Sequence, residues 1–517
     1  MTLFGNIRTV TIYPKLSGLC IIVITLILLI PADIHAQSNT SQQHSTVDQG
    51  TLHRSDSPTQ ELNLPNLGDA VSSTFSLEKE YQLGRAWLKA FRSSVETVND
   101  PLLQDYIEEL TYHLATHSEL KDRRLDMVVV NNKSINAFAV PGGVIGVHNG
   151  LLLQAETEAQ FASVLSHELA HLSQRHFARS IENAKRSTIP NLAGLLAGLL
   201  IAATTGSDAG LAVLTATQAA SLQNQLRYSR LHEQEADREG MQIMTRANMD
   251  PYAAAGMFEK MQQAIRYNAN RPPEFLLTHP ITESRISDTR NRARQYPRKM
   301  YTDNLRFQLM QARIDFSFAN SNANAEKTFR ARLASRAENT EAQQYGLVLA
   351  LMANRKYSEA STLLTTLRKG NKKEISYLIA EADLAVAQNN YQKAITLLEN
   401  FLDISPNNHP ATMSLANALL KNNQPHRAEV LLKTHVQQRS NDPYIWFLLA
   451  ETHGLAGNIV GVHQARAEYF VLNGALDSAI KQLGYALPLV KDDHLTSIKV
   501  KTRISQIQQE KAMIKAL

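Results

Sequence analysis

Residues 167–171 read His-Glu-Leu-Ala-His, and the rest of the chain is interpreted outward from this stretch. On a helix, two histidines four positions apart project from one face and can bind a single metal ion. Glu168 lies between them, where its carboxylate can act as a general base beside the metal. The pattern also arises by chance on ordinary surface helices, so the neighbouring sequence has to support it.

The residues around this motif predict an amphipathic helix. Thr157 and Gln160 are spaced as a capping box, and apolar residues then recur at helical spacing. We therefore predict a helix over about residues 157–178, with the motif well inside it. On that helix His176 would be rotated well away from His171, and we interpret it as structural.

The composition is that of a folded protein with two or three domains. The chain has 517 residues, of which 44% are hydrophobic. A net charge of +5 is small for this length, and no dense cluster of Lys and Arg is interleaved with aromatic residues. We therefore expect no nucleic-acid partner.

The first 36 residues have the order of a secretory signal peptide. Arg8 and Lys15 precede an apolar run over residues 18–30, and a proline and Ala36 follow it. The run is 13 residues long, which is short for a permanent membrane anchor. We predict cleavage after Ala36, which also removes Cys20, the single cysteine, so the mature chain would have no disulfide.

The segment before the motif predicts a flexible lead-in and two helices. Residues 37–67 are polar, with few large apolar groups, and should be flexible. Residues 77–114 have helical periodicity, interrupted at residues 99–101 by Asn-Asp-Pro.

A β-rich segment follows these helices. Residues 125–130 predict one strand, and residues 137–147 predict a second stretch interrupted by Pro-Gly-Gly at 141–143. Part of it could form an exposed sheet edge on which a peptide substrate adds as a further strand. The alternative is an ordinary hairpin whose turn needs two glycines, and the sequence leaves both open. The candidates for the edge are Asn136, Ala137 and Phe138.

Residues 191–225 contain two apolar runs rich in alanine and glycine. Neither run is strongly apolar for the 18 residues or so that a membrane span needs, so we predict a buried or interfacial helical hairpin. A lid over the site and a peripheral contact with a membrane are further interpretations of this segment.

The C-terminal part has a period of 34 residues, which is the length of the tetratricopeptide repeat. Two sets of mostly small residues repeat at this period, and such residues let paired helices approach closely. We predict an α-solenoid over residues 301–517, including a degenerate pair at about 305–336 and a shifted register beyond Leu472. The two sets are Val348, Ala382, Ala416 and Ala450, and Ala360, Ala394, Ala428 and Val462.

A hydrolytic zinc site takes three protein ligands and leaves one position open. His167 and His171 supply two ligands, and Glu233 and Asp237 share one face of a later helix. We assign Glu233 as the third ligand of one zinc ion, and Asp237 as the acceptor for the free ring N–H of His167. The alternatives are a solvated acidic helix, and His232 as a rival third ligand.

These predictions give a mainly α fold with a small β-sheet. A metalloprotease domain over residues 68–300 would precede the α-solenoid of repeats.

The combined motifs resemble the zinc metalloproteases that include HtpX and the CAAX prenyl endopeptidases, which have a zincin-type domain. The signal peptide and the repeats narrow the resemblance to the β-barrel assembly-enhancing members. The resemblance runs from about residue 77 to the end of the chain. The segments that carry it are His167–His171, the Glu233 and Asp237 pair, residues 136–138 and 141–143, and Thr278-His279-Pro280 followed by Arg285.

The resemblance implies a periplasmic zinc endopeptidase with chaperone-like activity. Such a protein degrades misfolded or stalled outer-membrane proteins, assists their assembly, and contacts the outer-membrane β-barrel assembly machinery through its repeats. It supports Glu233 as a ligand and implies that His279 covers the metal, as a regulatory or fourth ligand. Two alternative functions remain. One is a scaffold with a silent metal site, which would have no need of the general base Glu168. The other is an inner-membrane protease.

Overall fold

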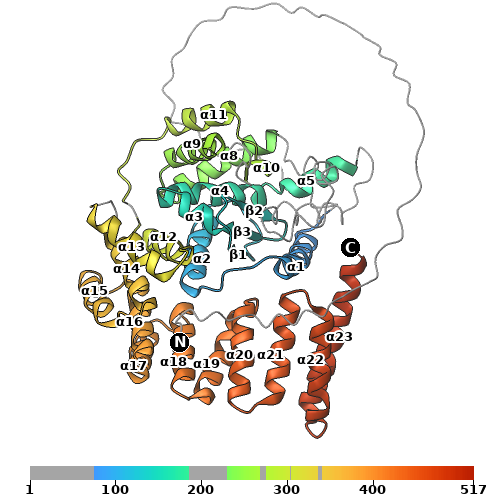
Figure 1. Ribbon diagram of the computed structural model, residues 1–517. Helices are drawn as coiled ribbons and strands as arrows, with labels where there is room; N and C mark the ends of the chain where they lie inside the picture. Colours follow the sequence, from blue (N-terminus) through green and yellow to red (C-terminus); the bar gives the residue numbers. More distant parts are fainter. Residues whose placement is uncertain (1–74, 186–229, 268–274, 303, 336–339, 517) are drawn as a thin grey trace, which may run out of the picture. The chain divides into compact units, whose positions relative to one another are not determined.

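The computed structural model describes residues 75–185, 230–267, 275–302, 304–335 and 340–516 (Figure 1). The predicted signal peptide (1–36), the lead-in (37–67) and the apolar segment (191–225) lie outside the described residues. The described part is mainly helical, with one three-stranded sheet, so the predicted fold class is confirmed. The domain boundary at residue 300 stays a prediction; it falls between helices α11 and α12.

Two helices precede the sheet, as the sequence predicts. Helix α1 (Leu77–Ser94) begins after Ser76, whose side chain accepts a hydrogen bond from a backbone N–H of the first turn. Helix α2 (Pro101–Thr116) begins after Asp100, which caps the helix in the same way, and a proline occupies its first position. The break between the two helices therefore follows from local capping.

The sheet has the strand order β1-β3-β2. Strand β1 (Asp126–Val130) runs parallel to β3 (Val144–His148), and β2 (Ala137–Val140) runs antiparallel to β3. Gly142 and Gly143 connect β2 to β3 with φ angles of 78° and 79°, which glycine adopts without strain. Strand β2 thus lies at one edge of the sheet among the described residues.

The motif lies on α4 (Glu158–Ser173), which ends earlier than the sequence predicts. The prediction of a helix continuing to residue 178 is wrong, because Arg175 adopts a left-handed φ of 51° and a new helix, α5 (His176–Lys185), begins after it. The Arg175 guanidinium donates hydrogen bonds of 2.9 and 3.1 Å to the buried carboxylate of Glu80. A long-range ion pair therefore holds the break.

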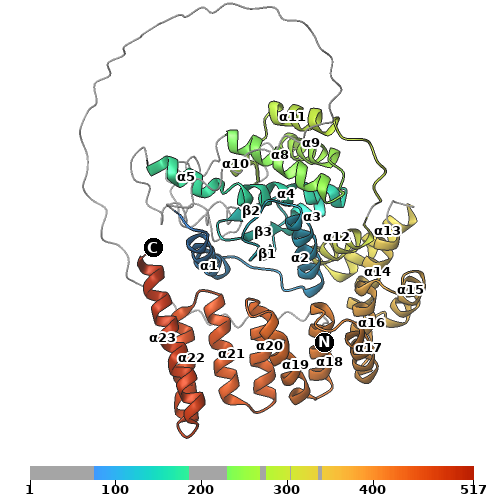
Figure 2. The same cartoon turned by 180° about the vertical axis from the view of Figure 1, so that it is seen from behind.

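Helix α4 is surrounded by other elements, which bury its motif. It packs against α2, against β2 and against α8 (Arg230–Arg246) and α9 (Tyr252–Tyr267). Gly240 of α8 allows the closest approach, since a Cβ there would lie 3.1 Å from the backbone nitrogen of His167. The chain then forms the short helix α10 (Phe275–Thr278) and α11 (Glu283–Ala293), both seen from behind in Figure 2.

The C-terminal part is a series of paired helices in which the 34-residue period is visible in the backbone. The turns inside four successive pairs each contain a residue with positive φ, at Arg355, Asn389, Asn423 and Gly457. Both figures show α18 to α23 standing side by side. Of the eight small residues that mark the period, all except Val462 are buried.

The helices of this part have the following bounds: α12 Leu305–Ser317, α13 Asn322–Ala334, α14 Thr340–Ala353, α15 Tyr357–Gly370, α16 Ile375–Ala387, α17 Tyr391–Ile404, α18 His409–Lys421, α19 Pro425–Gln438, α20 Pro443–Leu455, α21 Ile459–Leu472, α22 Leu476–Ala486 and α23 His494–Ala516. A short α3 (Asn149–Gln154) follows β3, and a 3₁₀ turn (Leu487–Val490) follows α22. Among the helices that the structure describes, none combines the length and apolarity needed to span a bilayer.

Candidate metal centre

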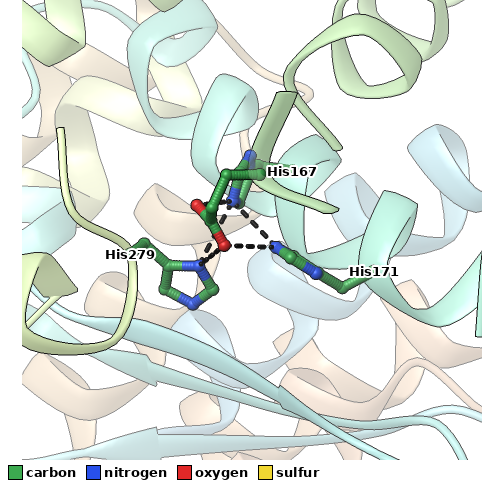
Figure 3. A group of neighbouring side chains, drawn as sticks. His167, His171 and His279 are labelled. Carbon is green, nitrogen blue, oxygen red and sulfur yellow. Dashed lines mark hydrogen bonds and ion pairs between the residues drawn. The ribbon is translucent and has the colours of Figure 1, made fainter. Parts of the chain in front are cut away.

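Four buried side chains from three parts of the chain meet at one point (Figure 3). His167 and His171 come from α4, Glu233 comes from α8, and His279 follows α10. The Nε2 atoms of His167 and His171 are 3.0 Å apart, and Nδ1 of His279 lies 3.4 Å from Nε2 of His167. Oε1 of Glu233 lies 3.0 Å from His279 Nδ1 and 3.5 Å from His171 Nε2.

These distances fit a single divalent cation. A tetrahedral ion with bonds near 2 Å to nitrogen and oxygen holds its ligand atoms about 3.3 Å apart. The four ligand groups all lie within 4.8 Å of one another, and three imidazoles with one carboxylate form a common donor set for such an ion. Within the described residues, these are the only four His, Cys, Asp or Glu side chains gathered in this way.

The far side of the His167 ring is held by a carboxylate. Oδ1 of Asp237 lies 3.0 Å from His167 Nδ1. Arg285 donates two hydrogen bonds of 2.7 Å to Asp237, and its Nη1 lies 2.8 Å from Oε2 of Glu233. Asp237 therefore lies beside His167, and its role as the acceptor for the ring N–H stays a prediction. Sequence reasoning gave Arg285 no structural role.

These ion pairs shift the pKa values of the buried groups. Burial alone would raise the pKa of Asp237, but the hydrogen bonds from Arg285 and His167 lower it. Burial would likewise raise the pKa of Glu233, yet the neighbouring His279 and His167 hold it well below its ordinary value. Against the effect of burial, Asp237 and Glu233 raise the pKa of His167 to about 9. The two carboxylates are therefore ionised and suited to a cation.

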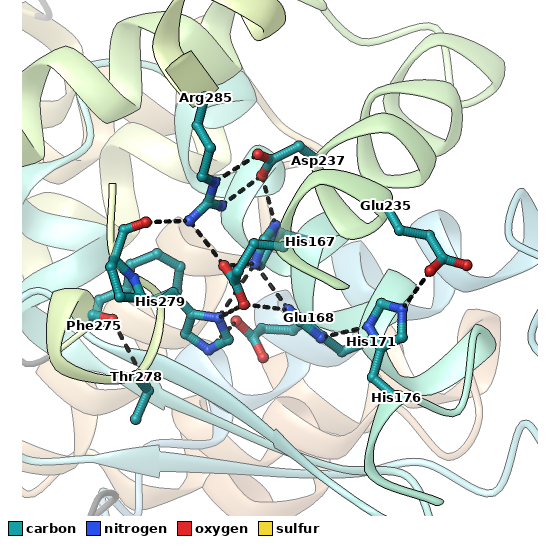
Figure 4. Close-up of polar contacts among 12 residues, drawn as sticks. His167, Glu168, His171, His176, Glu235, Asp237, Phe275, Thr278, His279 and Arg285 are labelled. Carbon is teal, nitrogen blue, oxygen red and sulfur yellow. Dashed lines mark hydrogen bonds and ion pairs between the residues drawn. The ribbon is translucent and has the colours of Figure 1, made fainter. Parts of the chain in front are cut away.

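The far side of the His171 ring is held by another histidine (Figure 4). Nδ1 of His176 lies 2.8 Å from Nδ1 of His171, and Nε2 of His176 lies 3.2 Å from Glu235. The prediction that His176 is rotated away is wrong, because α4 ends before it. His232, the rival ligand, stacks on His176 with ring centroids 4.4 Å apart and lies outside the four-residue cluster.

Glu168 lies beside the cluster and is 1% exposed. Its Oε1 atom lies 3.6 Å from Nε2 of His279. Burial raises the pKa of Glu168, and the neighbouring His279 and His167 act against this rise. A carboxylate with a raised pKa next to a cation can accept a proton from water and return it.

Strand β2 brings the predicted edge residues next to α4. Ala137 and Phe138 belong to β2, and Asn136 precedes it, with its carbonyl accepting a hydrogen bond from the backbone N–H of His148. The ring of Phe138 packs with Trp87 and other apolar side chains of the core. All three predicted edge side chains are buried, so any contact with a substrate would be made by backbone groups.

The comparisons with known proteins agree with this geometry. Residues 101–293 match the family model for peptidase family M48, and residues 345–409 and 385–451 match models for the tetratricopeptide repeat. The chain is 35% identical over 448 residues to the beta-barrel assembly-enhancing protease of Escherichia coli, covering 86% of this chain and 91% of the relative. The chain belongs to the β-barrel assembly-enhancing proteases.

Two other relatives show how far the similarity extends. The putative beta-barrel assembly-enhancing protease of Vibrio cholerae is 34% identical over 452 residues, which cover 87% of this chain and 93% of that protein. The mitochondrial metalloendopeptidase OMA1 of Schizosaccharomyces pombe is 29% identical over 189 residues, or 35% of this chain and half of that protein. The chain is therefore a metalloprotease that carries tetratricopeptide repeats.

Proposed function

We propose that this protein is a periplasmic zinc endopeptidase that degrades misfolded or stalled outer-membrane proteins and also assists their assembly. One observation carries the enzymatic part of this proposal. Ligand atoms of His167, His171 and Glu233 converge within 3.5 Å of one another, with Glu168 beside them. A protein that served only as a scaffold would have no need of a buried carboxylate at that position.

In the proposed site, His167, His171 and Glu233 hold one zinc ion, and Asp237 orients His167. Zinc is favoured over magnesium or calcium because imidazole nitrogens dominate the ligand set. Such an ion, when bound, lowers the pKa of a water ligand toward neutrality and polarises the carbonyl of the peptide bond to be cleaved. The chain's own residues supply the remaining steps.

Glu168 is the proposed general base. It takes a proton from the attacking water and later delivers that proton to the leaving amine. Helix α4, which carries Glu168, packs against strand β2. The proposed proton acceptor therefore lies on the helix that packs on the proposed substrate edge.

His279 is the proposed gate of the site. Its Nδ1 atom takes the fourth corner of the cluster, and its ring stacks on Phe275 at a centroid distance of 4.7 Å. A histidine in that position excludes the water on which Glu168 would act. In this proposal the resting enzyme is inactive, and His279 moves away when a substrate or a partner binds.

The proposed substrate lies as an added strand against β2. Asn136, Ala137 and Phe138 would bind it through backbone groups, since their side chains are buried. Recognition through the backbone depends little on sequence, which suits an enzyme that removes unfolded chains. The repeats would bring it to the outer-membrane β-barrel assembly machinery, as the names of its relatives suggest.

The test of this function is the Glu168→Gln variant, purified beside wild type. Gln keeps the size of the side chain and cannot accept the proton, so casein cleavage should fall by at least about 100-fold. Zinc content, measured by mass spectrometry, should stay near one ion per chain. Glu259→Gln, which alters a half-exposed carboxylate on α9, is the matched control. Cleavage that survived in Glu168→Gln would remove the proposed base.

A further inference from the structure

A line of side chains joined by hydrogen bonds and ion pairs leads from His171 away from the metal cluster (Figure 4). His176 is fully buried and lies with Nδ1 2.8 Å from Nδ1 of His171. Glu235 lies 3.2 Å from Nε2 of His176, and Nη1 of Arg179 donates to both carboxylate oxygens of Glu235 at 3.0 Å. The line thus connects a buried imidazole to a partly exposed ion pair.

The positions of the ring hydrogens of His171 and His176 follow from which nitrogen of His171 faces the cluster. His171 points Nε2 toward His167 and Glu233, so a metal would bind at Nε2. A neutral imidazole that binds metal through Nε2 carries its hydrogen on Nδ1. His176 must then accept at Nδ1 and carry its own hydrogen on Nε2, where Glu235 accepts it.

We propose that His176 is a positioning residue that fixes the tautomer and the ring orientation of His171, and that Glu235 fixes His176 in turn. This inference rests on the proposed function, because it needs a metal at His171. The two histidine ligands are then supported differently. Nδ1 of His167 faces the carboxylate of Asp237 directly at 3.0 Å, whereas an imidazole, that of His176, lies between Nδ1 of His171 and a carboxylate.

The backbone break at Arg175 makes this arrangement. On a continuous helix His176 would be rotated away from His171, but the left-handed residue turns α5 so that the two Nδ1 atoms meet. The ring of His232 stacks on the ring of His176 at an interplanar angle of 10° and limits the rotation of the His176 ring. The left-handed conformation of Arg175 thus sets the direction of α5, and through it the position of His176 beside His171.

The experiment compares four variants in the full-length protein. His176→Phe keeps the ring and removes the hydrogen bond, while His176→Gln restores an acceptor for His171. Glu235→Ala removes the last acceptor in the line. His453→Phe is the matched control, since His453 is also a buried histidine with a carboxylate partner, Glu429, but lies in the repeats.

The main readout is the dissociation constant for zinc, measured by competition with a chromophoric chelator. For His176→Phe we expect it to rise about 10- to 100-fold, as is usual when such support of a ligand is removed. The dissociation constant of His176→Gln should return most of the way to the wild-type value, and that of Glu235→Ala should rise less than that of His176→Phe. His453→Phe should have the wild-type dissociation constant. The visible spectrum of the cobalt-loaded protein should change only in His176→Phe and Glu235→Ala.

Three results would overturn the inference. One is a folded His176→Phe variant that binds zinc as tightly as wild type. Another is an equal loss in His176→Phe and His176→Gln with no effect of Glu235→Ala, which would indicate packing alone. If His176→Phe does not fold, unchanged zinc binding in Glu235→Ala refutes the inference and weaker binding supports it. Absence of zinc binding by wild type would instead refute the proposed function.

Discussion

Oδ1 of Asp237 lies 3.0 Å from Nδ1 of His167, on the opposite side of the ring from the four-residue cluster. The carboxylate is itself held by two hydrogen bonds from Arg285. A second layer of charged groups therefore lies behind the His167 ligand.

Asp237→Asn tests this second layer. The variant keeps the shape of the side chain but loses the charge that faces His167 and Arg285, so zinc affinity should fall about 10- to 100-fold. Chelator competition measures the change. Asp288→Asn on α11 also removes a carboxylate paired with an arginine, and it should have no effect on affinity. Equal affinities in the two variants would contradict the supporting role of Asp237.

His279→Ala tests the proposed gate. Removing the imidazole opens the fourth corner of the cluster, so the initial rate of cleavage of a short fluorogenic peptide should rise several-fold, on the order of 3- to 10-fold. Zinc content should stay near one ion per chain. Thr278→Ala is the control, because the Thr278 hydroxyl donates to the carbonyl of Phe275 and not to the cluster. A lower rate together with lost zinc would make His279 a required ligand and not a gate.

Gly142→Ala tests the turn that places β2. Gly142 has a φ of 78°, and a Cβ there would lie 2.3 Å from the carbonyl oxygen of Glu80. We expect the free energy of unfolding to fall by about 2–4 kcal/mol from backbone strain and overlap together. Gly370→Ala, where a Cβ meets nothing within 4 Å, should be nearly neutral.

Urea unfolding followed by tryptophan fluorescence measures this difference. The chain has two tryptophans, and in a Trp446→Phe background only Trp87, which is buried on α1, reports the transition. Equal urea midpoints for Gly142→Ala and Gly370→Ala would show that the turn tolerates a side chain.

The repeats should lose stability in mild acid. His409 and His435 are buried and hydrogen-bonded to each other at 2.9 Å, with Arg439 nearby and Asp442 3.8 Å from His409. Burial and the charge of Arg439 lower the pKa of His409 to about 2 and that of His435 to about 4.

The sign of this effect follows from which state binds protons. Unfolded histidines take up protons below about pH 6.5, while the folded pair stays neutral. The contribution of the pair to the free energy of unfolding is therefore fully present above that pH and is lost as the pH falls toward about 4. Each histidine contributes up to about 1.4 kcal/mol per pH unit in this range. Thermal melts at pH 7, 6 and 5 measure the slope. His435→Phe should reduce it, whereas His426→Gln, at an exposed position, should leave it unchanged.

Much of the fold could be predicted because its signals are local. The 34-residue period marks the buried small residues, such as Ala394 and Ala428, and the turns between paired helices repeat at the same interval. The capping residues Thr157 and Asp100 likewise mark helix starts that the structure shows. The caps depend on residues within one turn of chain, and the period depends on residues no more than one repeat apart.

The end of α4 could not be predicted, because its cause is distant in sequence. Arg175 is an unusual residue for a left-handed conformation, and Glu80, which holds it, lies 95 residues earlier. The wrong helix end also made the prediction for His176 wrong, because the direction of its side chain was predicted for a continuous helix. By contrast, the positions of Glu233 and Asp237 were predictable from their spacing of four, which puts both on one helical face.

The most direct test of the central claim is to locate the metal. Crystals of the zinc-loaded protein, measured on both sides of the zinc absorption edge, should show one anomalous peak about 2.0–2.2 Å from Nε2 of His167, Nε2 of His171 and a carboxylate oxygen of Glu233. A peak elsewhere, or a bound ion that Glu233 does not touch, would contradict the account.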